Sequence, residues 1–207
     1  MQTQNNTITN KDTILRPAGG TRCLSAILLS ALLFAGLARA GVPAPVTVTY
    51  TVTTQAATCN VTLPSGGTVN LNPVTVSDFA TSPVTKGGVT FAVTLSGCTG
   101  TPTTGTVPNL TYWGEADTSK GDTTLFKNKA PTGAAAGVGF VLYRGTSQAG
   151  SQLAVGSQAT PVAIPVTLSG GTGKVDFYAM PSRGGYPVSA VTAGAMRTAL
   201  NFNMDYR

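Results

Sequence analysis

The feature that most constrains the fold is the alternation of side chains at the end of the sequence. Between Gly194 and Tyr206 the even-numbered positions are mostly apolar, whereas Asn201, Asn203 and Asp205 are polar. The apolar positions are Met196, Leu200, Phe202, Met204 and Tyr206. A period of two residues is typical of a strand that buries one face. We therefore expect a half-buried strand here, held inside a sheet and covered along both edges.

The rest of the chain predicts more strands and no helices beyond the amino-terminal region. Thr is the most frequent residue, Val, Gly and Pro are abundant, and only 10% of residues are charged, as in secreted all-β proteins. Short β-like runs are separated by turn residues. The runs cover residues 60–63, 68–71, 74–79, 89–95, 110–114, 137–143, 162–168 and 175–179, with loops expected at 99–107 and 115–130. This spacing indicates one β-sandwich with Greek-key connections.

Residues 1–40 are expected to form a secretory signal. An uncharged apolar run, residues 24–38, follows Arg16 and Arg22 and ends in Ala38-Arg39-Ala40, a small-x-small cleavage pattern. The alternative is a membrane anchor, but about fifteen residues are short for a hydrocarbon core of about 30 Å. We expect cleavage after Ala40.

The segment after the predicted cleavage site alternates strictly. One face carries Val42, Ala44, Val46, Val48, Tyr50 and Val52, and Pro or Thr fills the other. Pro43 and Pro45 have no amide hydrogen to donate, so the segment suits an edge or an unpaired extension better than a central strand. The alternative is an ordinary first strand that pairs within its own domain.

Two cysteines remain after the signal, and a disulfide between them is the expectation. Cys59 and Cys98 are an even pair in an exported chain. Such a bond would stabilise the fold by about 4 kcal/mol in the chain-entropy model. The alternative is two buried free thiols. Cys23 precedes the apolar run and so does not fit a lipoprotein.

The sequence offers little catalytic or metal-binding chemistry. It has no His, the usual general base and metal ligand. Glu115 and Asp117 are the only close acidic pair after the signal, and their polar neighbours favour a solvated loop over a glycosidase pair. We expect no enzyme activity, no cofactor and no metal. Beyond Ala40 the net charge is only +3 with no basic run, so nucleic acid is not an expected partner.

These features together resemble a structural subunit of type 1-like fimbriae, which the chaperone-usher pathway builds. The resemblance covers residues 41–207. Family members carry a Gly fourteenth from the end and a penultimate Tyr, matched by Gly194 and Tyr206. An aromatic residue nine positions before the first Cys is matched by Tyr50, and Cys98 ends an alternating strand. Residues 112–114 and 136–139 match an aromatic-x-Gly strand end and the next strand opening.

The resemblance implies an incomplete immunoglobulin-like sandwich, residues 58–207, which lacks one strand. A donor strand from another subunit, within residues 41–57, would complete it. A periplasmic chaperone would fill the groove first, and an outer-membrane usher and head-to-tail copies would follow, at a cell-surface fimbrium. The implied groove and chaperone contacts are Gly194, Met196, Leu200, Phe202, Met204, Tyr206 and Arg207. Alternatively, Gly194 is a turn residue and Tyr206 an ordinary buried aromatic.

Three other functions compete with the shaft subunit. A fimbrial tip or adaptor adhesin, or a secreted carbohydrate-binding module, would use an exposed aromatic such as Trp113 or Tyr186. Tip adhesins usually add a receptor-binding domain and lack the donor segment, and this chain is too short for two sandwiches. A secreted β-sandwich enzyme is the third alternative.

Overall fold

Strands form two sheets that pack face to face, and no α-helix occurs in the parts of the chain that the structure describes. The structure is a computed structural model that describes residues 46–52, 59–82, 84–99 and 107–207. The strands are β1 Val46–Val52, β2 Asn60–Thr62, β3 Thr68–Leu71, β4 Val89–Ser96, β5 Pro108–Gly114, β6 Phe126–Lys127, β7 Gly139–Arg144, β8 Ser151–Gln152, β9 Val162–Pro165, β10 Gly173–Ser182 and β11 Met196–Tyr206. Three short 3-10 helices are η1 Pro64–Gly67, η2 Val76–Ala80 and η3 Val188–Ala190.

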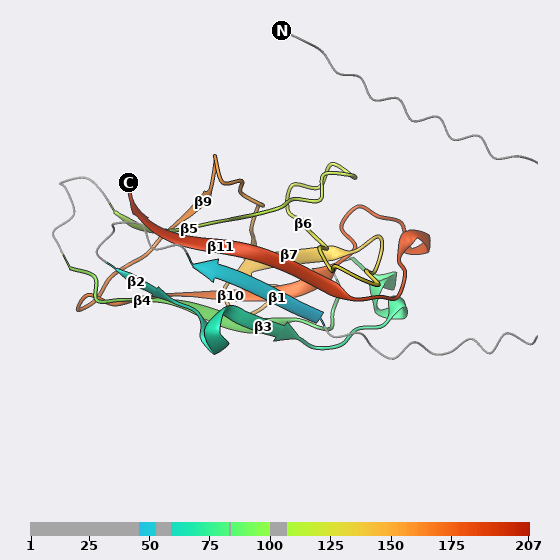
Figure 1. Cartoon of the computed structure of the whole chain (residues 1–207), viewed down its shortest axis with the longest axis horizontal. Coiled ribbons are helices and arrows are strands. Elements are labelled where there is room, and N and C mark those ends of the chain that lie inside the picture. Colours follow the sequence, from blue (N-terminus) through green and yellow to red (C-terminus); the bar gives the residue numbers. More distant parts are fainter. Residues whose placement is uncertain (1–45, 53–58, 83, 100–106) are drawn as a thin grey trace, which may run out of the picture. The chain divides into compact units, whose positions relative to one another are not determined.

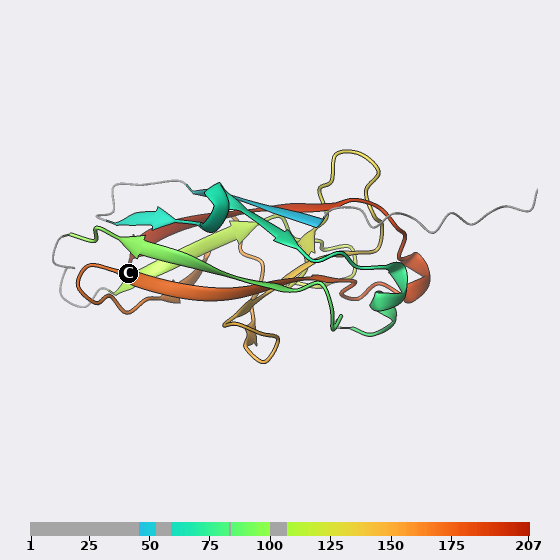
Figure 2. The ribbon, with the colours of Figure 1, turned by 90° about the horizontal axis from the view of Figure 1, so that it is seen from below.

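The first sheet has the strand order β3-β1-β11-β5-β9, and the second has β2-β4-β10-β7-β6, with β8 beside β7. Figure 1 shows β11 running the length of the first sheet with β1 beside it. The view from below in Figure 2 brings the second sheet forward, with the green β4 and the orange β10 side by side. The expected all-β sandwich is confirmed.

Alternating sequences build these strands because every second side chain enters the space between the sheets. In β4, Phe91, Val93 and Leu95 are buried while Thr90 and Thr94 are exposed. In β11, buried and more exposed residues alternate from Met196 to Met204, as predicted from the sequence. The interior between the sheets is therefore filled by aromatic and branched apolar side chains.

The placement of β1 bears on one expectation. The family resemblance implied that a strand from another subunit fills the position beside β11. Here the chain's own residues 46–52 fill it, which is the alternative of a first strand paired within its own domain. The physical reason is proximity: an apolar strand and an apolar groove on one chain meet at a high effective concentration. Val42 and Ala44 lie outside the described residues.

Other differences are local. The run 74–79 was expected as a strand, but residues 76–80 form η2, because Thr75 and Asp78 make a reciprocal capping box. The polar stretch 115–130 contains the short strand β6, whose Phe126 is buried. Leu125, just before it, is buried too. The predicted signal, residues 1–40, lies outside the described residues. In the described part, no helix is long and apolar enough to cross a membrane.

Candidate functional site

The position between β3 and β11, here called the β1 seat, is the place in the fold where a strand could be exchanged. β1 pairs antiparallel with β3 and parallel with β11, and Val48 lies opposite Val69 on one side and Thr198 on the other. Among the described strand pairs, only β1 with β11 is parallel. Parallel pairing is slightly less stable per residue than antiparallel pairing.

Of the β1 side chains that the structure describes, those of residues 47–50, two enter the core. Val48 is 1% exposed and Tyr50 is 5% exposed. The Tyr50 ring lies 4.7 Å from Phe91 of the second sheet and 5.5 Å from Phe202 of β11, measured between ring centroids. Phe91 and Phe202 each also contact the Phe177 ring. Tyr50 is therefore part of the aromatic cluster that joins the two sheets.

The seat buries two hydroxyl groups without a hydrogen-bond partner. They are the Tyr50 hydroxyl and Oγ1 of Thr198, which is 1% exposed. Burial raises the pKa of the Tyr50 phenol well above its ordinary value. A buried hydroxyl left unpaired costs about 1–3 kcal/mol. Sequence reasoning missed Thr198, although its even position in the alternating row of β11 already placed it on the buried face.

The predicted groove residues of β11 form one wall of the seat. Met196, Leu200, Phe202 and Met204 are all buried, at 0–3% exposure. They project from the same face of β11 because they are spaced by two or four residues. The structure thus brings these four together with Val48 and Tyr50. The backbones of Val46 and Val52 also pair with β11, opposite Met196 and Phe202.

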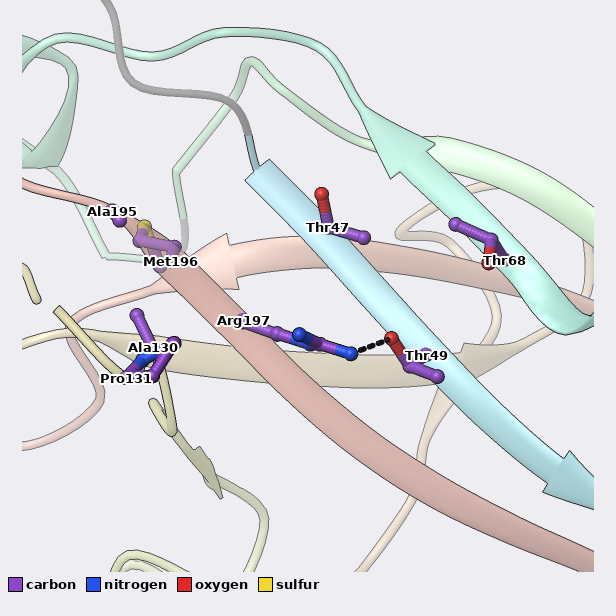
Figure 3. Close-up of a pocket in the computed structure, with 8 residues that line it drawn as sticks. All are labelled: Thr47, Thr49, Thr68, Ala130, Pro131, Ala195, Met196 and Arg197. Carbon is purple, nitrogen blue, oxygen red and sulfur yellow. Dashed lines mark hydrogen bonds between the residues drawn. The ribbon is translucent and has the colours of Figure 1, made fainter.

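On the outward side of the seat, a polar contact joins β1 to β11. The Arg197 guanidinium donates from Nη2 to Oγ1 of Thr49 over 3.2 Å, drawn as a dashed line in Figure 3. A hollow of about 320 Å³ surrounds this contact. It is lined by Thr47, Thr49, Thr68, Ala130, Pro131, Ala195, Met196 and Arg197. This exposed contact can be exchanged for water, so it holds β1 only weakly.

Gly194, just before β11, lies where no side chain fits. A Cβ there would stand 2.4 Å from the Ala135 nitrogen and 2.5 Å from the Gly133 oxygen. The backbones meet here because the Ala195 nitrogen donates to Gly133 O over 2.7 Å. Gly194 therefore permits the close approach that fixes where β11 starts, and it lies beside the seat without lining it.

The profile described as "Fimbrial protein" matches residues 46–207, from the first residue of β1 to the end of the chain. The chain belongs to the fimbrial protein family. The expectation that it is not an enzyme agrees with this membership, since the family is one of structural proteins. No curated protein matches the sequence significantly.

A solved pilus subunit resembles this fimbrial subunit in fold. The crystal structure of the P pilus rod subunit PapA matches with a TM-score of 0.53 and 18% identity, over 73% of this chain and 100% of that one. The CupB6 tip adhesin from Pseudomonas aeruginosa matches with a TM-score of 0.44 and 16% identity, over 62% of this chain. The match spans only 37% of that adhesin.

The disulfide of the fimbrial domain lies at one end of β11. Cys59 and Cys98 are bonded, as expected, and join the start of β2 to the end of β4. The Tyr206 hydroxyl lies 3.8 Å from Cys59 Sγ. Arg207 is exposed, and its backbone exchanges hydrogen bonds with Val107 in both directions. Tyr206 and Arg207 thus lie at the end of β11, beyond the residues that pair with β1.

The acidic pair has structural partners. The Glu115 carboxylate accepts a hydrogen bond from Lys127 Nζ and pairs with Lys129, and these contacts lower the pKa of its carboxyl to about 2. Both oxygens of Asp117 lie 3.0 Å from the Tyr186 hydroxyl. The Glu115 carboxyl, with its pKa lowered in this way, does not serve as a general acid at neutral pH. Within the described ranges no group of His, Cys, Asp and Glu could hold a metal ion.

Proposed function

We propose that this chain is a structural subunit of an adhesive surface fimbria, which assembles when β1 of one copy takes the β1 seat of another. The single observation that carries the proposal is the seat itself. A seven-residue strand lies between β3 and β11, and only residues 53–58 separate its end from Cys59. Such a strand can leave while the disulfide holds the remainder of the sandwich.

Burial makes an empty seat costly. Fully burying an apolar side chain contributes about 1.5–3 kcal/mol, so Val48 and Tyr50 together contribute about 3–6 kcal/mol. Whole domains are stable by only about 5–15 kcal/mol. The seat must therefore be filled at all times, either by the chain's own β1 or by an equivalent strand.

The chain's own β1 fits the seat imperfectly. It leaves the Tyr50 and Thr198 hydroxyls unpaired and pairs with β11 in the weaker parallel direction. A strand from another copy that ran antiparallel to β11 would run parallel to β3, so its direction alone brings no net gain. A strand seated in a different register could relieve the unpaired hydroxyls, and this is what would favour exchange over the closed single chain.

Exchange between copies leads to a filament. The donor segment and the acceptor seat are different surfaces, so the contact is heterologous and does not close on itself. Addition of a strand to a sheet edge is a known mode of recognition. Each copy accepts one strand and offers one, and the chain of copies grows head to tail.

Assembly requires that the seat be kept available. We propose that a periplasmic chaperone fills it first, contacting Gly194, the buried row of β11, Tyr206 and Arg207, and that an outer-membrane usher then directs the exchange. The support is the open outer hollow along the seam between β1 and β11, which leaves this side of the seat accessible. Passage through the periplasm follows from the predicted signal at residues 1–40.

A matched pair of variants tests the proposal. Val48→Asp places a charge on the buried side of β1, whereas Thr47→Asp places the same charge on the outward side, opposite Arg197. We expect Val48→Asp to abolish filaments seen by electron microscopy of cells, and Thr47→Asp to retain them. Deleting residues 41–52 should also abolish filaments and leave a copy that still accepts a strand from an intact one.

Mixing purified chains gives the decisive outcome. Refolded together with the intact chain, the deleted chain should be incorporated into head-to-tail assemblies, and refolded alone it should form none, as measured by size-exclusion chromatography with light scattering. Filaments formed by the deleted chain alone would refute the donor role of residues 41–52.

A further inference from the structure

A second hollow lies on the outer face of the first sheet, away from the core. It measures about 360 Å³ and is lined by Thr111, Trp113, Gln158, Pro161, Asn203, Asp205 and Arg207. Thr111 and Trp113 of β5 lie opposite Asn203 and Asn201 of β11. They point outward because Leu110, Tyr112 and Phe202 occupy the inward positions of the same strands. The hollow therefore lies over two paired strands of the rigid sheet.

The residues that form this hollow are held in place. Thr111 is 2% exposed, and its hydroxyl donates to Asn203 O over 3.2 Å. The loop that carries Gln158 is closed by reciprocal backbone hydrogen bonds between Ser157 and Thr160 at 3.2 Å, and their hydroxyls lie 2.8 Å apart. At its base, Gly114 N donates to Gly156 O over 3.1 Å. Gln158 itself is exposed at the tip of this turn.

We propose that this hollow binds a neutral hexopyranose unit of a glycan. Trp113, the only tryptophan of the chain, is partly exposed and offers a flat apolar surface to the C–H face of a sugar ring. Gln158 and Asn203 offer amide donors and acceptors for hydroxyl groups. A few polar groups around an aromatic surface are typical of small-molecule sites, whose volumes are about 300–1,000 Å³.

The charges of the hollow favour a neutral ligand. Its two charged side chains, Asp205 and Arg207, pair with each other, with Arg207 Nε 2.7 Å from Asp205 Oδ2. No net charge is left to attract an acidic sugar. The paired groups can still donate and accept hydrogen bonds at the rim. The site lies on the outer face of the sheet, so its occupation does not depend on which copy fills the β1 seat.

The single tryptophan provides the test. Full-length chain is titrated with maltotriose, mannotriose and lactose as neutral probes, with 3′-sialyllactose as the acidic probe, while tryptophan fluorescence is recorded. We expect a saturable change with at least one neutral probe, with a dissociation constant in about the millimolar range. No saturable change with any neutral probe, or saturation with 3′-sialyllactose alone, would overturn the proposal.

Variants locate the binding. Gln158→Ala and Asn203→Ala should each weaken binding by about threefold to tenfold, measured by calorimetry. Trp113→Ala should abolish it, and Trp113→Phe, which keeps a smaller ring, should weaken it less. Gln152→Ala removes the same kind of amide from the second sheet and should bind like the natural chain. Each variant is compared only where its Tm matches that of the natural chain. Unchanged binding in both Gln158→Ala and Asn203→Ala would refute the assignment.

Discussion

Among single residues, Tyr50 gives the clearest prediction about stability, because its buried, unpaired hydroxyl lowers the free energy of unfolding of the closed chain. Its ring packs within the aromatic cluster, but its oxygen is buried without a partner. We predict that Tyr50→Phe raises the free energy of unfolding by about 1 kcal/mol, because the ring stays and the unpaired polar group is removed. Urea denaturation measures this. Thr198→Val should act in the same direction, and a loss of stability in both variants would show that the hydroxyls are paired in solution.

The same phenol predicts a pH dependence. Burial raises the pKa of folded Tyr50, whereas the unfolded chain ionises near the ordinary value of 10.0. Above this pH the unfolded state loses the proton and the folded state keeps it, so stability falls as pH rises. The loss should be smaller for Tyr50→Phe than for the natural chain when unfolding is measured from pH 8 to about pH 11. Tyr112 and Tyr143, whose pKa values burial also raises, contribute equally to both chains.

A side chain at position 194 is expected to clash with the backbone of a neighbouring segment. Gly194→Ala should lower the free energy of unfolding by about 1–3 kcal/mol, because the added Cβ meets the backbone of residues 133–135. Its exposed neighbour supplies the control, since Ala193→Ser should change stability by less than about 0.5 kcal/mol. Thermal or urea unfolding distinguishes the two. Equal stability of all three chains would contradict the close approach seen here.

At the scale of elements, alternation alone predicted most of the sandwich. β4, β5, β10 and β11 were expected within a few residues of their observed ends. β4 and β11 alternate between buried and more exposed residues along their length, whereas β5 and the end of β10 are buried on both faces. η2 was missed because a local capping box outweighed a short apolar run. β6 was not predicted because a strand of two residues is too short to show an alternating pattern of side chains. These are limits of local patterns, which do not report contacts between distant segments.

The β1 seat was predicted only in part. The alternating rows of β1 and β11 indicated that each needs an apolar partner, and Met196, Leu200, Phe202 and Met204 of β11 are buried. Their role as a groove for another chain stays a prediction. Which chain supplies the partner is a matter of proximity and concentration, and no side-chain pattern encodes it. The Trp113 hollow likewise depends on the approach of the Gln158 loop, which lies 45 residues away in the sequence.

The disulfide joins two strands, because Cys59 precedes β2 and Cys98 follows β4. Its cysteines are 39 residues apart, so its removal should lower the free energy of unfolding by about 4 kcal/mol in the chain-entropy model. The double variant Cys59→Ala with Cys98→Ala, compared with the natural chain in urea, measures this. A change below about 1 kcal/mol would show that the remaining contacts of β2 hold it in place without the bond.

At the scale of the whole molecule, the structure shows the chain's own β1 in its seat, with Val48 and Tyr50 buried and the Arg197 contact exposed. In the assembly proposed above, β1 of another copy takes this seat, so the chain's own β1 must first leave it. We therefore predict that any bond that locks β1 to β11 prevents assembly.

A reversible crosslink across the seat measures this most directly. Thr49 and Ala199 are paired in register and both point outward, so cysteines at the two positions can form a disulfide without disturbing the core. Thr49→Cys with Ala199→Cys should remain monomeric when oxidised and should assemble like the natural chain once this exposed bond is reduced, as seen by electron microscopy. Filaments of normal length from the oxidised chain would contradict the exchange of β1 between copies.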